Sequence, residues 1–243
     1  SDVTGAMARI GEKELKAMPV RNALEGMQGK TAGVDITSSQ RPGEVGNINI
    51  RGQRSINAEQ GPLYVVDGMV IQNGGIENIN PSDIEAIDIL KDASSTAIYG
   101  ARGANGVIII TTKSGKEGKV QVDFGASFGV KQVTRLTKVL DPYNYVAYQN
   151  EIDMGKHGNY SDMDIWRSVD GFDYQDEMFG RTGNQQQYNI NVSGGSKELQ
   201  YSVSYAHNEE KSIMLNSGFK KDNINAKIKS ELNKWLSLDF NAR

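Results

Sequence analysis

The sequence predicts an α+β domain, with a small mixed sheet and short helices, followed by a run of long antiparallel β-strands. Before Gly115, short β-branched runs alternate with helix-like segments. After it, long segments alternate apolar and polar residues. The charged, glycine-rich stretch 113–118 separates the two patterns, as a turn between domains would. We therefore predict one domain over residues 1–117 and a second over residues 118–243.

The overall composition excludes several classes of function. A chain of 243 residues can bury a sizeable core. With 27 Lys and Arg against 30 Asp and Glu, it has no basic excess for nucleic-acid binding. The absence of cysteine excludes disulfides, thiolate nucleophiles and cysteine-ligated zinc. The sequence contains no run of roughly 18 apolar residues, so no transmembrane helix is predicted. Its first residues lack the pattern of a signal peptide.

In the first domain, the predicted elements are short. Helices are expected over 12–18 and 21–28, with Leu24 and Met27 on one face. Asp67-Gly68 joins two apolar runs and predicts a type I′ hairpin, which requires positive φ at both residues. A third helix is expected over 93–99, with Gly100 as its C-terminal cap. The predicted strands cover residues 34–36, 46–51, 63–66, 69–71 and 107–112.

In the second domain, about five segments show strict two-residue periodicity. They cover residues 120–130, 188–192, 199–205, 224–228 and 236–240. Such segments are typical of a transmembrane β-barrel, with apolar residues facing lipid and polar residues facing the lumen. They equally fit a soluble β-sandwich whose apolar faces pack together. The pattern by itself leaves both alternatives open.

No motif indicates catalysis, a metal or a cofactor. His157 and His207 lie far apart and in different contexts. The glycines of residues 100–106 follow a predicted helix and precede a strand, which is the wrong order for a phosphate-binding loop. The acidic stretch 162–177 could supply oxygen ligands for calcium, but it lacks the EF-hand spacing. The long segment 140–183 is otherwise polar, with a helix expected over 143–154.

Four ordered blocks of the first domain carry a family resemblance, covering residues 50–52, 61–68, 79–85 and 90–108. On these blocks the chain resembles SusC/RagA-like TonB-dependent outer-membrane transporters, and later segments resemble the early barrel of that family. The resemblance implies a plug domain followed by the first strands of a barrel, which has about 22 strands in such transporters. Five strands cannot close such a barrel, so we expect the chain to be a piece of a longer protein, without the TonB-contacting segment. The plug motif residues are Arg51, Gly52, Asp67, Gly68, Tyr99, Gly100, Arg102, Gly103, Asn105 and Gly106.

The resemblance also implies a function. The complete protein would lie in the outer membrane of a Gram-negative bacterium and would import a glycan or a peptide. Its partners would be TonB, which couples energy, and a SusD-like surface lipoprotein, and it would not be an enzyme. Two other classes stay open on the residues alone: a soluble α/β ligand-binding module with an attached β-domain, and an enzyme whose carboxylates the sequence does not pair.

Two polar loops of the plug are candidates for ligand contact. They cover residues 53–60 and 72–77, and their amides and glycines suit hydrogen bonding to polyols or peptide backbones. The alternative is that they are solvated turns. Arg51 and Arg102 are expected to form ion pairs within the plug or between plug and barrel. We also expect proteases to cut after residue 118 before they cut within 1–117. The candidate ligand contacts are Gln53, Arg54, Asn57, Gln72 and Asn73.

Overall fold

The computed structural model describes residues 7–16, 20, 22–39, 41–50, 61–71, 76–91, 97–153 and 163–243. The chain forms two compact units. The first comprises Ser1–Gly129, Asn184–Lys211 and Gly218–Arg243, and the second comprises Val130–Gly183 and Ser212–Ser217. The first unit contains both a mixed sheet and an antiparallel sheet.

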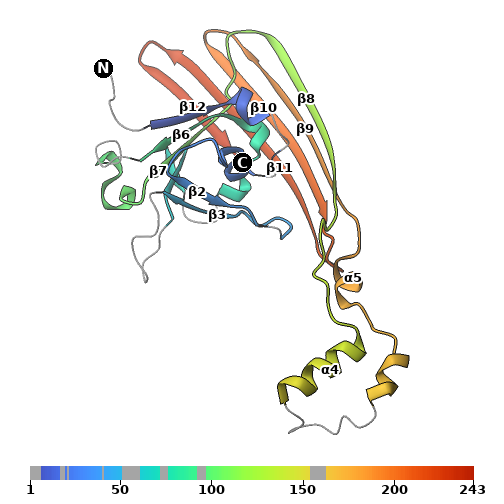
Figure 1. The fold of residues 1–243 in the computed structure, drawn as a ribbon. Coiled ribbons are helices and arrows are strands. Elements are labelled where there is room, and N and C mark those ends of the chain that lie inside the picture. Colours follow the sequence, from blue (N-terminus) through green and yellow to red (C-terminus); the bar gives the residue numbers. More distant parts are fainter. Residues whose placement is uncertain are drawn as a thin grey trace. The chain divides into compact units, whose positions relative to one another are not determined.

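The mixed sheet has five strands in the order β1-β6-β7-β4-β5 (Figure 1). Strands β4 and β7 are parallel, and the remaining neighbours are antiparallel. The central strands are buried and rich in β-branched residues, as strands covered on both faces must be. The strands are β1 (Met7–Gly11), β4 (Leu63–Val66), β5 (Met69–Ile71), β6 (Ile84–Leu90) and β7 (Val107–Thr112).

Short helices and a hairpin complete this domain. Asn22 caps α2 (Ala23–Met27), because its side chain accepts a hydrogen bond from the Glu25 amide at 3.0 Å. Leu24 and Met27 are both buried, as their spacing predicts. The remaining elements of this domain are α1 (Glu12–Lys16), the hairpin of β2 (Val34–Thr37) and β3 (Asn47–Ile50), and the 3₁₀ turns η1 (Ile76–Asn78) and η2 (Pro81–Asp83). Strands β1 to β7, together with these helices and turns, are called the plug elements below.

The third predicted helix differs from the structure. Residues 92–96 lie outside the described part of the chain, and Ala97–Gly103 forms the 3₁₀ segment η3. Gly100 has φ 62° and ψ −152°, so it kinks this segment instead of capping an α-helix. The predicted helical end at Tyr99, with a positive-φ glycine after it, agrees with this break, but the described turn before it is a 3₁₀ helix and not an α-helix. Strand β1 was not predicted, because its five residues become a strand only by pairing with β6.

The five long strands form an antiparallel meander in the order β12-β11-β10-β9-β8, which we call the wall sheet (Figure 1). Each strand pairs with its neighbour in sequence. The five periodic segments of the sequence are thus confirmed as strands of one sheet. The bounds are β8 (Gly118–Lys131), β9 (Gly183–Gly195), β10 (Leu199–Lys211), β11 (Gly218–Asn233) and β12 (Leu236–Ala242).

The two faces of the wall sheet have opposite chemistry. Its apolar face is bare, and Phe124 and Phe128 are 72% and 70% exposed. Its polar face is covered, and Asn191, Ser202 and Asn225 are buried. A soluble β-sandwich would bury the apolar face instead. The structure therefore decides between the two alternatives that the periodicity left open.

The second compact unit is helical. It contains α4 (Pro142–Asp153), the 3₁₀ segment η4 (Met163–Ser168) and α5 (Tyr174–Phe179). The Arg167 guanidinium lies 3.9 Å from the centre of the Tyr143 ring and also pairs with Asp164. Asp173 caps α5 by accepting from the amides of Gln175 and Asp176. These contacts give two of the acidic residues of segment 162–177 a structural role.

Candidate functional site

The candidate site is the polar interface between the plug elements and the wall sheet. Side chains alternate along a strand, so every second residue of β8–β12 points to the covered face. On β11 these residues include Lys221, Asn223 and Lys227, which all contact plug elements. The interface is thus formed by hydrogen bonds and charges, and it has the opposite character to the isoleucine-rich core inside the plug.

The turn at Asp67 positions the central carboxylate of this interface. Asp67 and Gly68 have φ values of 48° and 84°, so the predicted type I′ hairpin between β4 and β5 is confirmed. The Asp67 carboxylate accepts hydrogen bonds from the Thr112 amide at 2.9 Å and the Thr112 hydroxyl at 2.6 Å. These two bonds attach the hairpin turn to the end of β7, its parallel neighbour.

The same carboxylate joins the plug to two wall strands. The Lys227 ammonium of β11 lies 3.3 Å from Oδ1, and the Asn241 amide of β12 donates to Oδ2 at 3.0 Å. The Arg243 guanidinium also pairs with Oδ2. The Asp67 side chain is only 9% exposed. A carboxylate this buried is stable as a charge only when donors and cations surround it, and all of its partners here are of those two kinds.

Opposing effects set the pKa of Asp67. Burial alone would raise the pKa, but the two hydrogen bonds from Thr112 and the charges of Lys227 and Arg243 outweigh it. The pKa is therefore held below its ordinary value. Asp67 stays charged throughout the neutral range and keeps its attraction for the wall.

Asp83 is a second buried carboxylate of the plug at this interface. Burial raises the pKa of Asp83, and a hydrogen bond from Ser204 of β10 and the charges of Lys113 and Arg243 offset that effect only in part. The Asp83 carbonyl also accepts from the Lys113 amide at 2.8 Å. Asp67 and Asp83 thus share Arg243 as a cationic neighbour, but their pKa values move in opposite directions.

Further contacts seat the plug on β10 and β11. The Lys221 ammonium donates to the Glu77 carbonyl, and the Asn223 amide donates to the Asn78 carbonyl at 2.9 Å. A Cβ atom on Gly115 would lie 2.4 Å from backbone atoms of Tyr201, so the chain touches β10 at this glycine.

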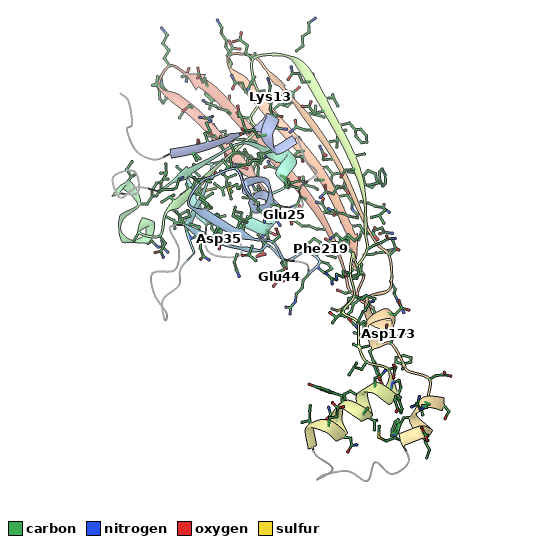
Figure 2. All side chains as sticks on the ribbon, in the orientation of Figure 1. Lys13, Glu25, Asp35, Glu44, Asp173 and Phe219 are labelled. Atoms are coloured by element: carbon green, nitrogen blue, oxygen red, sulfur yellow. The ribbon has the colours of Figure 1, made fainter. Side chains whose placement is uncertain are left out.

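A ring of β11 packs in the same close way. A Cβ on Gly43 would lie 2.2 Å from the ring of Phe219. Figure 2 labels Phe219 near Glu44, the residue that follows this glycine, and both line one small cavity. Backbone and ring atoms therefore reach contact distance where only a glycine leaves room.

The predicted site residues fall into three groups. Arg51, Gly52 and the ligand candidates Gln53, Arg54, Asn57, Gln72 and Asn73 lie outside the described residues. Tyr99, Gly100, Arg102, Gly103, Asn105 and Gly106 lie on η3 and the turn before β7, and the Arg102 side chain is exposed. Asp67 and Gly68 form the hairpin turn at the interface. Their assignment as a structural motif of the family stays a prediction.

Sequence reasoning missed the partners of Asp67. Lys227, Asn241 and Arg243 lie 160 to 176 positions away in the chain. The alternation of polar and apolar residues could indicate that Lys227 and Asn241 lie on the polar face of their sheet. It could not indicate which part of the chain covers that face.

Histidine and metal chemistry add nothing to this site. His207 lies on β10 and contacts Asp222 of β11 at 2.7 Å. Among the described residues, no group of three or more histidine, aspartate or glutamate side chains could hold a metal ion. No helix within the described ranges is long and apolar enough to cross a membrane.

Comparisons with known proteins agree on one family. Residues 1–107 match the family described as TonB-dependent Receptor Plug Domain. The chain is 37% identical over 230 residues to the TonB-dependent receptor SusC of Bacteroides thetaiotaomicron, covering 91% of this chain and 22% of SusC. It is 37% identical over 242 residues to the TonB-dependent receptor P39 of Formosa agariphila, covering 98% of this chain and 23% of that protein. The chain thus spans about a quarter of the length of these relatives.

Solved structures have the same arrangement. The RagAB peptide importer in its closed-closed state matches with a TM-score of 0.85 and 28% identity, over 99% of this chain and 30% of that one. The siderophore receptor PirA of Acinetobacter baumannii matches with a TM-score of 0.60 at 20% identity, over 97% of this chain and 31% of that one, which supports the fold alone. The relatives named here are receptors and an importer.

Proposed function

The chain belongs to the SusC/RagA-like TonB-dependent receptors, as their plug domain followed by the first barrel strands, and on that premise we propose that its full-length protein imports a polar nutrient across the outer membrane of a Gram-negative bacterium. The proposed substrates are glycans and peptides. The proposed partners are TonB and a SusD-like surface lipoprotein. We propose the domain boundary near residue 117, where the plug elements give way to β8.

One observation carries the proposal: the plug elements cover the polar face of the wall sheet, while its apolar face is bare. Strands with apolar residues on the outer face and polar residues on the inner face are what a lipid-embedded barrel requires. A domain on the inner face blocks the lumen. Such a domain must seal the lumen at rest and yield during transport, which suits an interface of polar contacts better than a continuous apolar core.

The substrate class follows from the polar lining and from the relatives. A lumen lined by amides, hydroxyls and balanced charges favours a solute that is dense in hydrogen-bonding groups. A structural relative is a peptide importer. The loops at residues 53–60 and 72–77 remain proposed ligand contacts, with Gln53, Arg54, Asn57, Gln72 and Asn73 as the residues to test.

The test is uptake by the source bacterium. Its gene would be deleted and restored, and cells would be offered fluorescently labelled oligosaccharides and peptides, with TonB present or deleted. We expect uptake of at least one labelled compound to need both the gene and TonB. Immunoblots of boiled and unboiled cell fractions should show a heat-modifiable outer-membrane band. Unchanged uptake of every compound after deletion, or a soluble band, would refute the proposal.

A further inference from the structure

Two cavities separate the plug elements from strands β8 and β9. The first has a volume of about 320 Å³ and lies between Leu15, Pro81 and Ile84 of the plug and Ser127 and Asn189 of the wall. The second has a volume of about 340 Å³. Both are within the usual size range of small-molecule sites. The second lies between Glu85, Lys116 and Glu117 on one side and Gln121, Asp123 and Asn191 on the other.

The cavities lie end to end along the same two strands. On β8, inward positions 121 and 123 line the second cavity, and positions 125 and 127 line the first. On the antiparallel strand β9, positions 193 and 191 line the second cavity, and positions 189 and 187 line the first. With a rise of about 3.4 Å per residue, the two cavities together extend roughly 20 Å along β8. We call this pair of cavities the seam.

One ion pair lies where the cavities meet. Glu12 and Lys113 line both cavities, and their charged groups are 3.0 Å apart. The Glu12 side chain is 40% exposed. The Lys113 side chain is only 16% exposed, but water can reach the Glu12 carboxylate, which lowers the cost of separating the pair. Its separation would join the two cavities.

Along the neighbouring strands β10 and β11, the cavity between plug and wall is much smaller, at about 40 Å³. There Asp67 is bound by Lys227, Asn241 and Arg243, and Lys221 and Asn223 of β11 donate to backbone carbonyls of η1. Between the plug and β9, the Gln187 side-chain amide donates a hydrogen bond to the Val20 carbonyl at 3.4 Å. The buried charged contacts of the plug are therefore on β10–β12, and the two larger cavities lie along β8 and β9.

Resting on the function proposed above, we propose that the seam along β8 and β9 is the path by which the solute passes the plug, and that the Glu12–Lys113 pair is its partition. The solute is a narrow chain dense in hydroxyl or amide groups. The second cavity carries acidic and basic side chains side by side, which gives no net preference for an anion or a cation. Its wall residues Gln121, Asn191 and Ser193 can donate and accept hydrogen bonds.

The test blocks the seam chemically in the full-length transporter. This chain has no cysteine, and any cysteine elsewhere in the full-length protein would be replaced. Ser127→Cys and Gln121→Cys place a thiol in each cavity. Ser237→Cys on β12 is the control, because it also faces the plug side of the wall sheet but lines neither cavity. Cells would take up the labelled panel compound that the wild type imports best, before and after treatment with a bulky thiol reagent.

We expect the reagent to remove most of the uptake by the Ser127→Cys and Gln121→Cys variants, and to leave uptake by the Ser237→Cys variant near its untreated level. Each variant is compared with itself before treatment, so a folding defect does not imitate a block. Equal loss in all three variants, or no loss in the two seam variants, overturns the seam as the path. If the untreated wild type imports no panel compound in a TonB-dependent way, the proposed function itself fails.

Discussion

The plug meets the wall sheet in two different ways. Against β10–β12, buried charges and close backbone contacts hold the plug, with Asp67 at their centre, and the cavity lined by Glu44 and Phe219 has a volume of only about 40 Å³. Against β8–β9, two cavities intervene and a partly exposed ion pair lies between them. One side can keep the plug in place while the other rearranges. Substitutions on the two sides should therefore have very different effects on stability.

The largest effect is expected at Gly115. Gly115→Val would place side-chain atoms within 2.4 Å of the backbone of Tyr201, which cannot move without disturbing β10. We expect a loss of about 3 kcal/mol or more in the free energy of unfolding of the full-length protein, from overpacking. Urea denaturation would measure it. Gly11→Ala is the matched control, since nothing lies within 4 Å of its added Cβ; an equal loss there would contradict the comparison.

The next effect is expected at Asp67. Asp67→Asn removes the charge that Lys227 and Arg243 attract, and should cost about 1.5–3 kcal/mol, the range for hydrogen bonds to charged groups. A double-mutant cycle with Lys227→Met would isolate the pair. Hydrogen exchange of the β7 amides, which reports opening of the plug, is the second readout. Additive losses in the cycle would show that the ion pair does not couple plug and wall.

The two buried carboxylates should give opposite pH dependence. The pKa of Asp67 is lowered in the folded protein, so its contribution to stability is full above the unfolded value of about 3.9 and is lost as pH falls through the lowered pKa. The pKa of Asp83 is raised, so its ionisation costs stability as pH rises through the raised pKa.

Asp83→Asn should therefore raise the free energy of unfolding at neutral pH. In the wild type this free energy declines as pH rises from the unfolded pKa of about 3.9 to the raised pKa of the folded state, and the substitution should flatten that decline. Urea titrations across this interval are the measurement. Asp67→Asn, by contrast, should alter the pH profile only below the unfolded value. A neutral-pH loss of stability in Asp83→Asn would show that its hydrogen bond with Ser204 outweighs the burial of its charge.

The smallest effect is expected on the cavity side. Glu12→Gln removes the charge of a partly exposed pair and should change the free energy of unfolding by less than about 1 kcal/mol. Thermal unfolding of the full-length protein in detergent would check this. A loss as large as that of Asp67→Asn would mean that the plug is held equally on both sides, and the comparison would not stand.

Local chemistry made some elements predictable. The Asp67-Gly68 turn follows from the need for positive φ at both positions, and few residue pairs meet that need. The spacing of Leu24 and Met27 predicts the buried face of α2, and both side chains are buried. The helix expected over 93–99 is described only from Ala97, where the chain forms a 3₁₀ turn that Gly100 interrupts with a positive φ.

The sequence by itself determined most of the short plug elements, the long two-faced strands and the family, because turn chemistry, periodicity and motif order are properties of neighbouring residues. Only the tertiary structure decided which face of the wall sheet is covered. Only it brought Lys227, Asn241 and Arg243 to Asp67 and left cavities beside β8 and β9. Alternation determines which residues share a face, but the partners of Asp67 and the linings of the cavities come from different segments of the chain, and their contacts depend on how the whole chain folds.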